Sequence, residues 1–262
     1  MSIDGSGSVG TPLVDGIRRS ALLHGLPEED LTAVLGACRV LRRDRGQRLL
    51  RSGGDAVLIV LQGAAKEHRA VSQVDEVVLA LLGAGDVAGL TGALGTPCAG
   101  DVTALTDAAA LLMPGGELRS LARERPAVAQ AWLQTAVAEL GDLRRQVLAF
   151  STMSTTGRVV YRLVELAERF GEPIDGEVRI RAQLTQEELA SWARASRESV
   201  ARALHELRRA RIIMTRRRSL TILDLEALRQ RLPCADQHAV SEPLLSPRVV
   251  AGFPEVLDVD LR

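Results

Sequence analysis

The sequence has few of the residues that build disulfides, metal sites and aromatic binding surfaces. Its 262 residues include three cysteines, four histidines and only 2% aromatic residues. Cys38, Cys98 and Cys234 lie far apart without CxxC spacing, which argues against a disulfide framework, a zinc site and a four-thiolate cluster. The histidines form no HxH or HExxH pattern. We therefore expect no metal, no cofactor and no catalytic residues.

Long apolar runs are missing as well. No stretch of about 18 uninterrupted apolar residues is present, so we expect no membrane-spanning helix and no membrane partner. The segment MSIDGSGSVGTPLVDG lacks the basic start and apolar centre of a secretory signal. The apolar fraction of 46% and the charged fraction of 25% are those of an ordinary soluble protein. These features predict a cytoplasmic protein.

The charge is distributed unevenly, although the net charge is zero. Residues 176–231 contain thirteen arginines against seven aspartates and glutamates, a surplus of six. A basic segment in an otherwise neutral chain indicates a polyanionic partner for that segment.

The first half of the chain has the pattern of a β domain. We expect a disordered Gly/Ser-rich tail over residues 1–16 and then a helix that Pro27 opens. From Val40 to Pro114, short apolar runs such as VLIVLQG (57–63) and VVLALLGAGD (77–86) alternate with Gly and Asp. Several short strands at this spacing predict a barrel or jelly roll, in a domain over residues 17–116.

A long helix is expected in the next region, residues 117–152. Apolar residues recur there at alternating steps of three and four, namely Leu133, Ala136, Leu140, Leu143, Val147 and Phe150. This heptad spacing is typical of a helix that pairs with another helix, and it favours a homodimer. The alternative is a helix that packs on its own barrel. Gly141 within the helix costs about 1 kcal/mol of helix propensity relative to Ala.

The last structured region, residues 153–232, has the pattern of a winged helix-turn-helix. GRVVYRLVELAERFG is an amphipathic helix, and LTQEELASWAR and SRESVARALHELRRA predict two more. The strand-like runs IIMT and LTIL flank Arg216–Ser219 and predict a β-hairpin. The fold class is therefore α+β. The proline-rich segment 233–262 is expected to be a disordered tail.

The third of these helices carries residues suited to reading DNA. Thr185 and Glu188 form a capping-box pattern for the second helix, and Ser196 is a good N-cap for the third. Val200, Leu204 and Leu207 share one stripe of the third helix, and Glu198 and Arg202 point nearly opposite. Arg can donate two hydrogen bonds to guanine, and Glu can accept from cytosine. A solvated helix with a Glu198–Arg202 ion pair is the alternative.

LTQEELASWARASRESVARALHELRRARII resembles the DNA-binding module of the Crp/Fnr family of bacterial transcription regulators. RDRGQRLLRSGGDAVLIVLQGAAKE and VVLALLGAGDVAGL are similar to that family's cyclic-nucleotide-binding jelly roll. The resemblance implies a dimer on a TGTGA-like inverted repeat of double-stranded DNA, with RNA polymerase as a further partner. Arg194 departs from the pattern, because the family often has Gly in the turn. The DNA-binding residues implied in this way are Thr185, Gln186, Ser196, Arg197, Glu198, Ser199, Arg202, Arg216, Arg217 and Arg218.

The effector pocket implied by the resemblance is degenerate. Members of the family that bind cyclic AMP carry a Gly-Glu pair for the ribose and then Arg with Ser or Ala for the phosphate. Alignment on Gly89 places Leu90 at the Glu position, Cys98 at the Arg position and Ala99 at the Ser position. An anion buried without a cationic partner costs several kcal/mol, so we expect no tight cyclic AMP binding. Cys98 also allows an oxidant-sensing role, although no neighbouring cation is evident.

Three classes of function are candidates for this sequence. The first is a transcription regulator that is independent of cyclic AMP, or one that responds to another ligand. The second is a scaffold whose helix-turn-helix contacts only proteins, which would not need base-reading and phosphate-binding arginines together. The third is an enzyme, which would require a His/Glu ligand cluster on the barrel, where only His68 occurs. We expect a regulator and not an enzyme.

Overall fold

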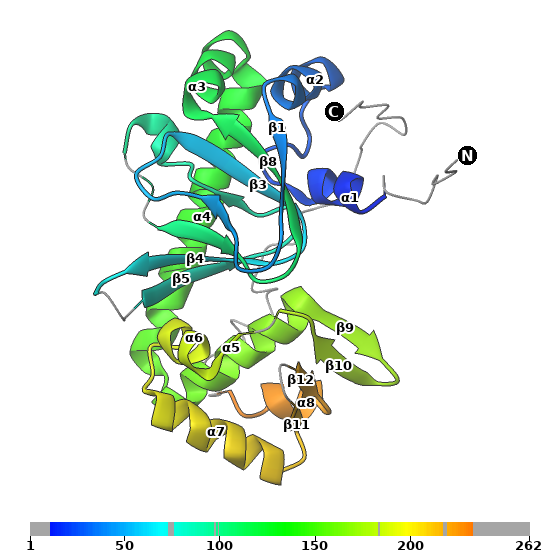
Figure 1. Ribbon diagram of the computed structural model, residues 1–262, viewed down its shortest axis with the longest axis vertical. Helices are drawn as coiled ribbons and strands as arrows, with labels where there is room; N and C mark the ends of the chain where they lie inside the picture. Colours follow the sequence, from blue (N-terminus) through cyan, green and yellow to red (C-terminus); the bar gives the residue numbers. More distant parts are fainter. Residues whose placement is uncertain are drawn as a thin grey trace, which may run out of the picture. The chain divides into compact units, whose positions relative to one another are not determined.

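The computed structural model describes residues 11–72, 76–96, 98, 100–182, 184–216 and 219–232 (Figure 1). These residues fall into two compact units. The first contains the described residues up to Ala65 and those from Leu82 to Ala136. The second contains those from Lys66 to Leu81 and those from Val137 onward.

The β-strands of the N-terminal half form two four-stranded sheets. One has the order β1 (Arg39–Arg43), β8 (Ala108–Pro114), β3 (Ala56–Gln62) and β6 (Val87–Ala88), with antiparallel neighbours. The other has the order β2 (Arg48–Leu50), β7 (Asp101–Ala104), β4 (Ala65–Ala70) and β5 (Glu76–Leu82). This confirms the predicted β domain, in which glycine-rich turns separate short strands.

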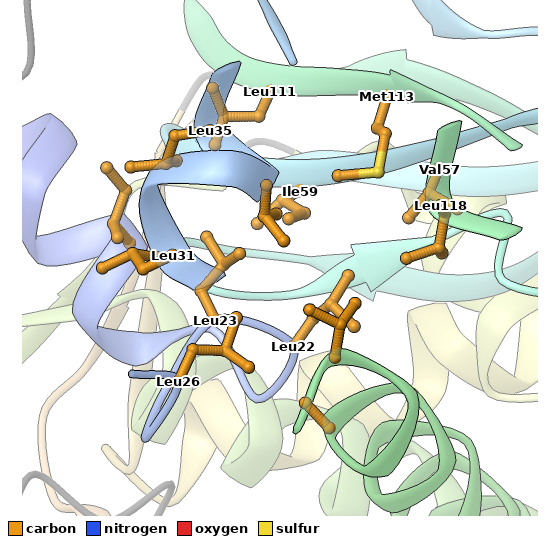
Figure 2. Packing of buried hydrophobic residues seen from close by; sticks show 14 of the residues in the cluster. Leu22, Leu23, Leu26, Leu31, Leu35, Val57, Ile59, Leu111, Met113 and Leu118 are labelled. Carbon is orange, nitrogen blue, oxygen red and sulfur yellow. The ribbon is translucent and has the colours of Figure 1, made fainter. Parts of the chain in front are cut away.

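The core of the first unit lies between the β1–β8–β3–β6 sheet and the helices that cover it. Five consecutive residues of β3, Val57–Leu61, are buried. Val57, Ile59 and Leu61, on one face of the strand, pack with α1 (Thr11–Arg19), α2 (Glu28–Gly36), α3 (Gly115–Glu124) and the start of α4 (Pro126–Thr152). Figure 2 shows Leu22, Leu23, Leu31 and Leu35 gathered with Ile59 and Leu111. The unbroken apolar sequence of β3 is therefore that of a strand whose two faces are both covered.

The predicted tail over residues 1–16 is wrong from Thr11 onward, where α1 begins. Leu13 and Ile17 of this helix are buried. A Cβ at Gly16 would lie 2.3 Å from the carbonyl oxygen of Leu61, so this glycine lets the helix backbone contact the strand. The Gly/Ser-rich composition concealed a short amphipathic helix. Residues 1–10, like the predicted tail 233–262, lie outside the described part of the chain.

The second unit contains the predicted helix-turn-helix. Its helices are α5 (Thr155–Phe170), α6 (Gln186–Trp192), α7 (Arg197–Arg209) and the short α8 (Leu225–Arg229). Val159, Leu163 and Leu166 of α5 are buried, as their spacing predicted. α5 packs against α6, α7 and α8 in this unit (Figure 1).

The predicted two-stranded hairpin is part of a larger sheet. Strands β11 (Ile213–Arg216) and β12 (Ser219–Ile222) pair as expected, and β10 (Glu177–Ile180) and β9 (Gly171–Ile174) extend the sheet. The turn between β9 and β10 is Asp175–Gly176, and both residues have positive φ. An Asp-Gly pair between strand-like residues is a strong hairpin signal, so this turn is recognisable in the sequence.

Candidate nucleic-acid interface

The first helix of the helix-turn-helix, α6, begins with the predicted capping box. The Thr185 hydroxyl accepts a hydrogen bond from the Glu188 amide at 3.1 Å, and Glu188 accepts one from the Thr185 amide at 2.7 Å. Lys66 also donates to Glu188 at 2.7 Å and pairs with Glu76. Burial would raise the pKa of Glu188, but the hydrogen bonds from Lys66 and Thr185 outweigh it and hold that pKa below its ordinary value.

We expect the Glu188→Gln variant to lose stability at neutral pH. A glutamate whose pKa is lowered by folding stabilises the protein above its unfolded pKa, and this contribution is lost as pH falls through the folded pKa. Loss of charged hydrogen bonds of this kind costs about 1.5–3 kcal/mol each at most. Thermal unfolding should show a lower Tm than the parent at pH 7. The difference in Tm between the variant and the parent should narrow below about pH 4.3. The exposed neighbour variant Glu187→Gln should shift Tm little at any pH; equal shifts in both variants would contradict this role.

The second helix, α7, has its buried and exposed faces where the sequence predicted them. The Ser196 hydroxyl accepts from the Ser199 amide at 3.2 Å and so caps the helix. Val200, Leu204 and Leu207 are buried, together with Ala203. Arg197, Glu198 and Arg202 are exposed, so their side chains are free of the core.

The exposed charged residues of α7 offer hydrogen-bond donors and acceptors. A hydrogen bond from its own backbone N–H, and one from Ser196, hold the pKa of Glu198 below its ordinary value. The carboxylate is therefore ionised at neutral pH and can only accept hydrogen bonds. Arg197 and Arg202 supply donors on either side of it in the sequence. Thr185 and Gln186 are exposed at the start of α6.

The turn between α6 and α7 uses the conformation that usually favours glycine. Arg194 has φ +49°, in the left-handed region. The amide of Ala195 donates to Ala190 O at 2.9 Å and closes the turn. A non-glycine residue in this conformation is strained. Contacts with neighbouring residues must therefore stabilise the left-handed backbone at Arg194.

The wing lies beside these helices in the same unit. Arg216 is exposed at the end of β11, next to the turn. Arg208 of α7 donates to the Thr215 hydroxyl at 3.1 Å, which ties the wing to the second helix. Arg217 and Arg218, the other predicted wing residues, lie outside the described residues.

The predicted helix-pairing seam is an exposed apolar stripe on α4. Of the predicted seam residues, Leu133, Leu140, Leu143 and Val147 are 48% to 68% exposed. Val137 and Leu148, which lie beside the seam, are also exposed, at 60% and 67%. Ala136, which the seam also includes, is exposed too. The opposite side of the helix buries Ala131, Thr135 and Ala149. Residues spaced by three and four thus face away from the chain's own core.

Phe150, predicted as the last seam residue, is placed differently. It is half-buried and packs edge-to-face on Tyr161, with ring centroids 6.1 Å apart. The Arg162 guanidinium also lies 4.7 Å from the centre of its ring. The end of the heptad pattern therefore joins α4 to α5 within the chain, and the exposed stripe ends at Leu148.

Leu90 and Cys98, two of the predicted effector pocket residues, are buried in the first unit. Leu90 is 5% exposed and belongs to the core cluster, so its side chain faces apolar neighbours. Gly89 has φ +82°, and a Cβ there would lie 2.3 Å from Ala56 O. Cys98 is 4% exposed, and its thiol donates to Gly54 O at 3.2 Å. Ala99 lies outside the described residues.

One guanidinium, that of Arg119, contacts this segment, but its hydrogen bonds are made to protein groups. Arg119 of α3 donates to Ala93 O at 2.6 Å, at the short helix η1 (Gly92–Leu94). It also bonds both oxygens of the Asp55 carboxylate, at 3.2 and 3.1 Å. These contacts use Arg119 to fasten α3 and the β2–β3 loop to η1.

Within the described residues, no helix has the length and apolar character needed to cross a membrane. The same residues also contain no group of three or more His, Cys, Asp or Glu residues placed to hold a metal ion.

Comparison with known proteins matches both halves of the chain. Residues 40–125 match the cyclic nucleotide-binding domain, and residues 157–231 match the Crp-like helix-turn-helix domain. The cyclic AMP receptor protein of Thermus thermophilus is 30% identical over 198 residues, 73% of this chain and 87% of that protein. The CRP-like cAMP-activated global transcriptional regulator of Mycobacterium tuberculosis is 28% identical over 218 residues, 82% of this chain and 97% of that protein.

Solved structures have the same fold. FixK2 from Bradyrhizobium japonicum superposes with a TM-score of 0.63 at 18% identity, covering 75% of this chain and 98% of that one. The regulator CLP of Xanthomonas campestris superposes with a TM-score of 0.62 at 19% identity, covering 75% and 99%.

Proposed function

This chain belongs to the Crp/Fnr family of transcription regulators, and on that premise we propose that it is a homodimer that reads an inverted repeat in double-stranded DNA without needing cyclic AMP. The observation that carries the proposal is the exposed set on α7: Glu198 and Arg202 lie opposite a buried stripe, and Arg197 is exposed in the first turn of the helix. The N-terminal part of the second helix is the part of a helix-turn-helix that enters the major groove. Because the ligand is chromosomal DNA, we place the protein in the cytoplasm.

The residue types on α7 favour a G·C-containing half-site. Arg side chains pair with guanine O6 and N7, and an ionised Glu accepts from the cytosine amino group. Glu198 is held in that ionised form. Thr185, Gln186, Ser196, Ser199 and Arg216 are then contacts that position the protein on the DNA backbone.

The exposed stripe on α4 supports the homodimer. Four large apolar side chains at helix-pairing spacing, Leu133, Leu140, Leu143 and Val147, are exposed in the single chain. A parallel pair of α4 helices would bury them, as in a coiled coil. Two copies of α7 would then meet DNA half-sites about 34 Å apart, one helical turn.

We expect calorimetry to show no low-micromolar binding of cyclic AMP. In the alignment on Gly89, Leu90 and Cys98 take the positions of the carboxylate and the cation that the nucleotide would require, and both side chains are buried among protein atoms. An uncompensated buried phosphate costs several kcal/mol, and each 1.4 kcal/mol lowers affinity tenfold. The Mycobacterium tuberculosis relative, which is named as cAMP-activated, is the matched positive control. A low-micromolar dissociation constant for this chain would sink the proposal of cyclic AMP independence.

Selection from a random duplex library tests the DNA proposal without assuming an operator. Protein-bound duplexes would be enriched over several rounds and sequenced in the absence of nucleotide. We expect an inverted repeat similar to TGTGA, with half-site centres about 10–10.5 base pairs apart. Enrichment of no sequence, or of a single unrepeated motif, would count against a dimeric reader.

A further inference from the structure

The helix-turn-helix turn is held from behind by two arginines of α5. Arg162 Nε donates to Trp192 O at 3.2 Å, and Arg158 Nε donates to Ala193 O at 3.2 Å. Arg158 Nη2 donates to Arg194 O at 3.0 Å. Three consecutive carbonyl groups at the end of α6 thus accept guanidinium hydrogen bonds. The last carbonyls of a helix have no partner within it, so these contacts satisfy groups that the helix leaves open.

The third of these carbonyls belongs to the strained residue of the turn. Arg194 has φ +49° and lies between the end of α6 at Trp192 and the start of α7 at Arg197. A glycine would adopt this conformation at little cost. An arginine needs surroundings that favour it over the relaxed alternatives. The charged hydrogen bond from Arg158 to the Arg194 carbonyl is a contact of that kind.

The same two side chains reach the C-terminal part of α4. Arg158 Nη1 donates to Met153 O at 3.2 Å, just after α4 ends. Arg162 Nη2 donates to the Gln146 side chain on α4 at 3.2 Å. Each guanidinium therefore bridges from the α4 end to the turn that precedes α7. All these residues belong to the second unit.

Arg162 is the more deeply enclosed of the two. Its side chain is 2% exposed and pairs with Glu165 at 2.6 Å. Its guanidinium lies 4.3 Å from the centre of the Trp192 ring and 4.7 Å from that of Phe150. This arrangement stacks the cation between α4 and α6 and resists sliding of one against the other.

We propose that Arg158 and Arg162 are positioning residues for base recognition: they hold the left-handed turn at Arg194 and set the direction of α7 relative to the end of α4. This inference rests on the proposed DNA-reading function. Removing Arg158 leaves α7 folded but frees its approach angle. The hydrogen bonds to bases are then weakened, because they need accurate alignment, whereas the nonspecific contacts to phosphates persist.

The test combines Arg158→Ala with Arg194→Gly in all four combinations. Each protein is titrated on a duplex bearing the inverted repeat and on a scrambled duplex, and its Tm is measured. We expect Arg158→Ala to lower specific affinity about tenfold or more, the worth of one aligned base contact, and to change scrambled-duplex affinity less than about threefold. In the Arg194→Gly background the same change should cost much less specific affinity, because glycine needs no support at this φ.

Arg169→Ala supplies the matched control. It removes another α5 guanidinium, which pairs with Glu165 at 3.1 Å and lies near the Phe170 ring. We expect the ratio of specific to scrambled affinity to stay at the parent value in this variant. The Arg162→Ala variant should resemble Arg158→Ala in that ratio, with a larger fall in Tm because Glu165 loses a buried partner.

The outcomes separate this inference from the proposed function. An unchanged specificity ratio in Arg158→Ala, or equal losses with and without Arg194→Gly, would overturn the positioning role. If the parent protein itself prefers no inverted repeat, the proposed function fails. The Tm values alone then test whether Arg158 supports the turn at Arg194. Equal Tm losses from Arg158→Ala in both backgrounds would then show that Arg158 does not support Arg194, and unequal losses would show that it does.

Discussion

The double variant Leu140→Arg/Leu143→Arg should be a monomer that binds the inverted repeat at least a hundredfold more weakly than the parent protein. Both leucines are about half exposed in the single chain, at 48% and 51%, so the substitutions leave its own core intact. In a paired helix each arginine would be buried against a like charge, which is strongly unfavourable. Tethering two half-site contacts commonly strengthens binding by about 10²–10⁴, and the monomer loses that gain.

Sedimentation and anisotropy titration together measure this effect. Gln134→Arg/Ala138→Arg is the matched control, because it adds the same charge at exposed α4 positions outside the heptad seam. The control should remain dimeric and keep its affinity. A leucine variant that remains dimeric would show that this stripe does not pair the subunits. A monomer that binds the repeat as tightly as the parent would show that pairing does not strengthen DNA binding.

Arg202→Ala should lower affinity for the inverted repeat by about 1–3 kcal/mol per contacted base pair, roughly 5- to 150-fold. Arg202 is exposed on α7, so its removal should leave the fold unchanged. The preference at one position of the half-site should relax, since one donor pair to a guanine edge is lost. Titration against a set of single-base variants of the repeat shows which position is affected.

Arg216→Ala is the comparison variant that distinguishes a contact to a base from a contact to the phosphate backbone. Arg216 is exposed on the wing, where we propose a phosphate contact. Its loss should weaken binding to all sequences alike and reduce the slope of log affinity against log salt by about 0.9 per subunit. If Arg202→Ala behaved in this way instead, with equal losses on specific and scrambled duplexes, its assignment as a base reader would be wrong.

The helix-turn-helix could be predicted in detail because its signals are local. The capping box of Thr185 and Glu188 and the cap at Ser196 depend on side chains three residues from the amides they bond. The buried stripe of α7 follows from helical periodicity alone, and Val200, Leu204 and Leu207 are all buried. The left-handed turn could be raised only as a question, from the presence of Arg194 where the family often has glycine.

What could not be predicted depends on contacts between elements distant in sequence. Nothing local marks Arg158 as a partner of the Ala193 and Arg194 carbonyls, which lie 35 and 36 residues later. Phe150 fits the heptad spacing, yet packing against Tyr161 turns it inward. In contrast, the extra strands around Asp175–Gly176 carried a recognisable turn signal that was overlooked.

The central claim is that this family member reads its operator without cyclic AMP. The most direct measurement is an anisotropy titration of the purified protein on a duplex carrying TGTGA-N6-TCACA, with and without cyclic AMP, against a scrambled duplex. We expect tight binding to the repeat, weak binding to the scrambled duplex, and curves that coincide with and without the nucleotide. Specific binding that appears only with cyclic AMP would contradict the proposed independence from cyclic AMP, and would mean that Leu90 and Cys98 do not disable the effector site.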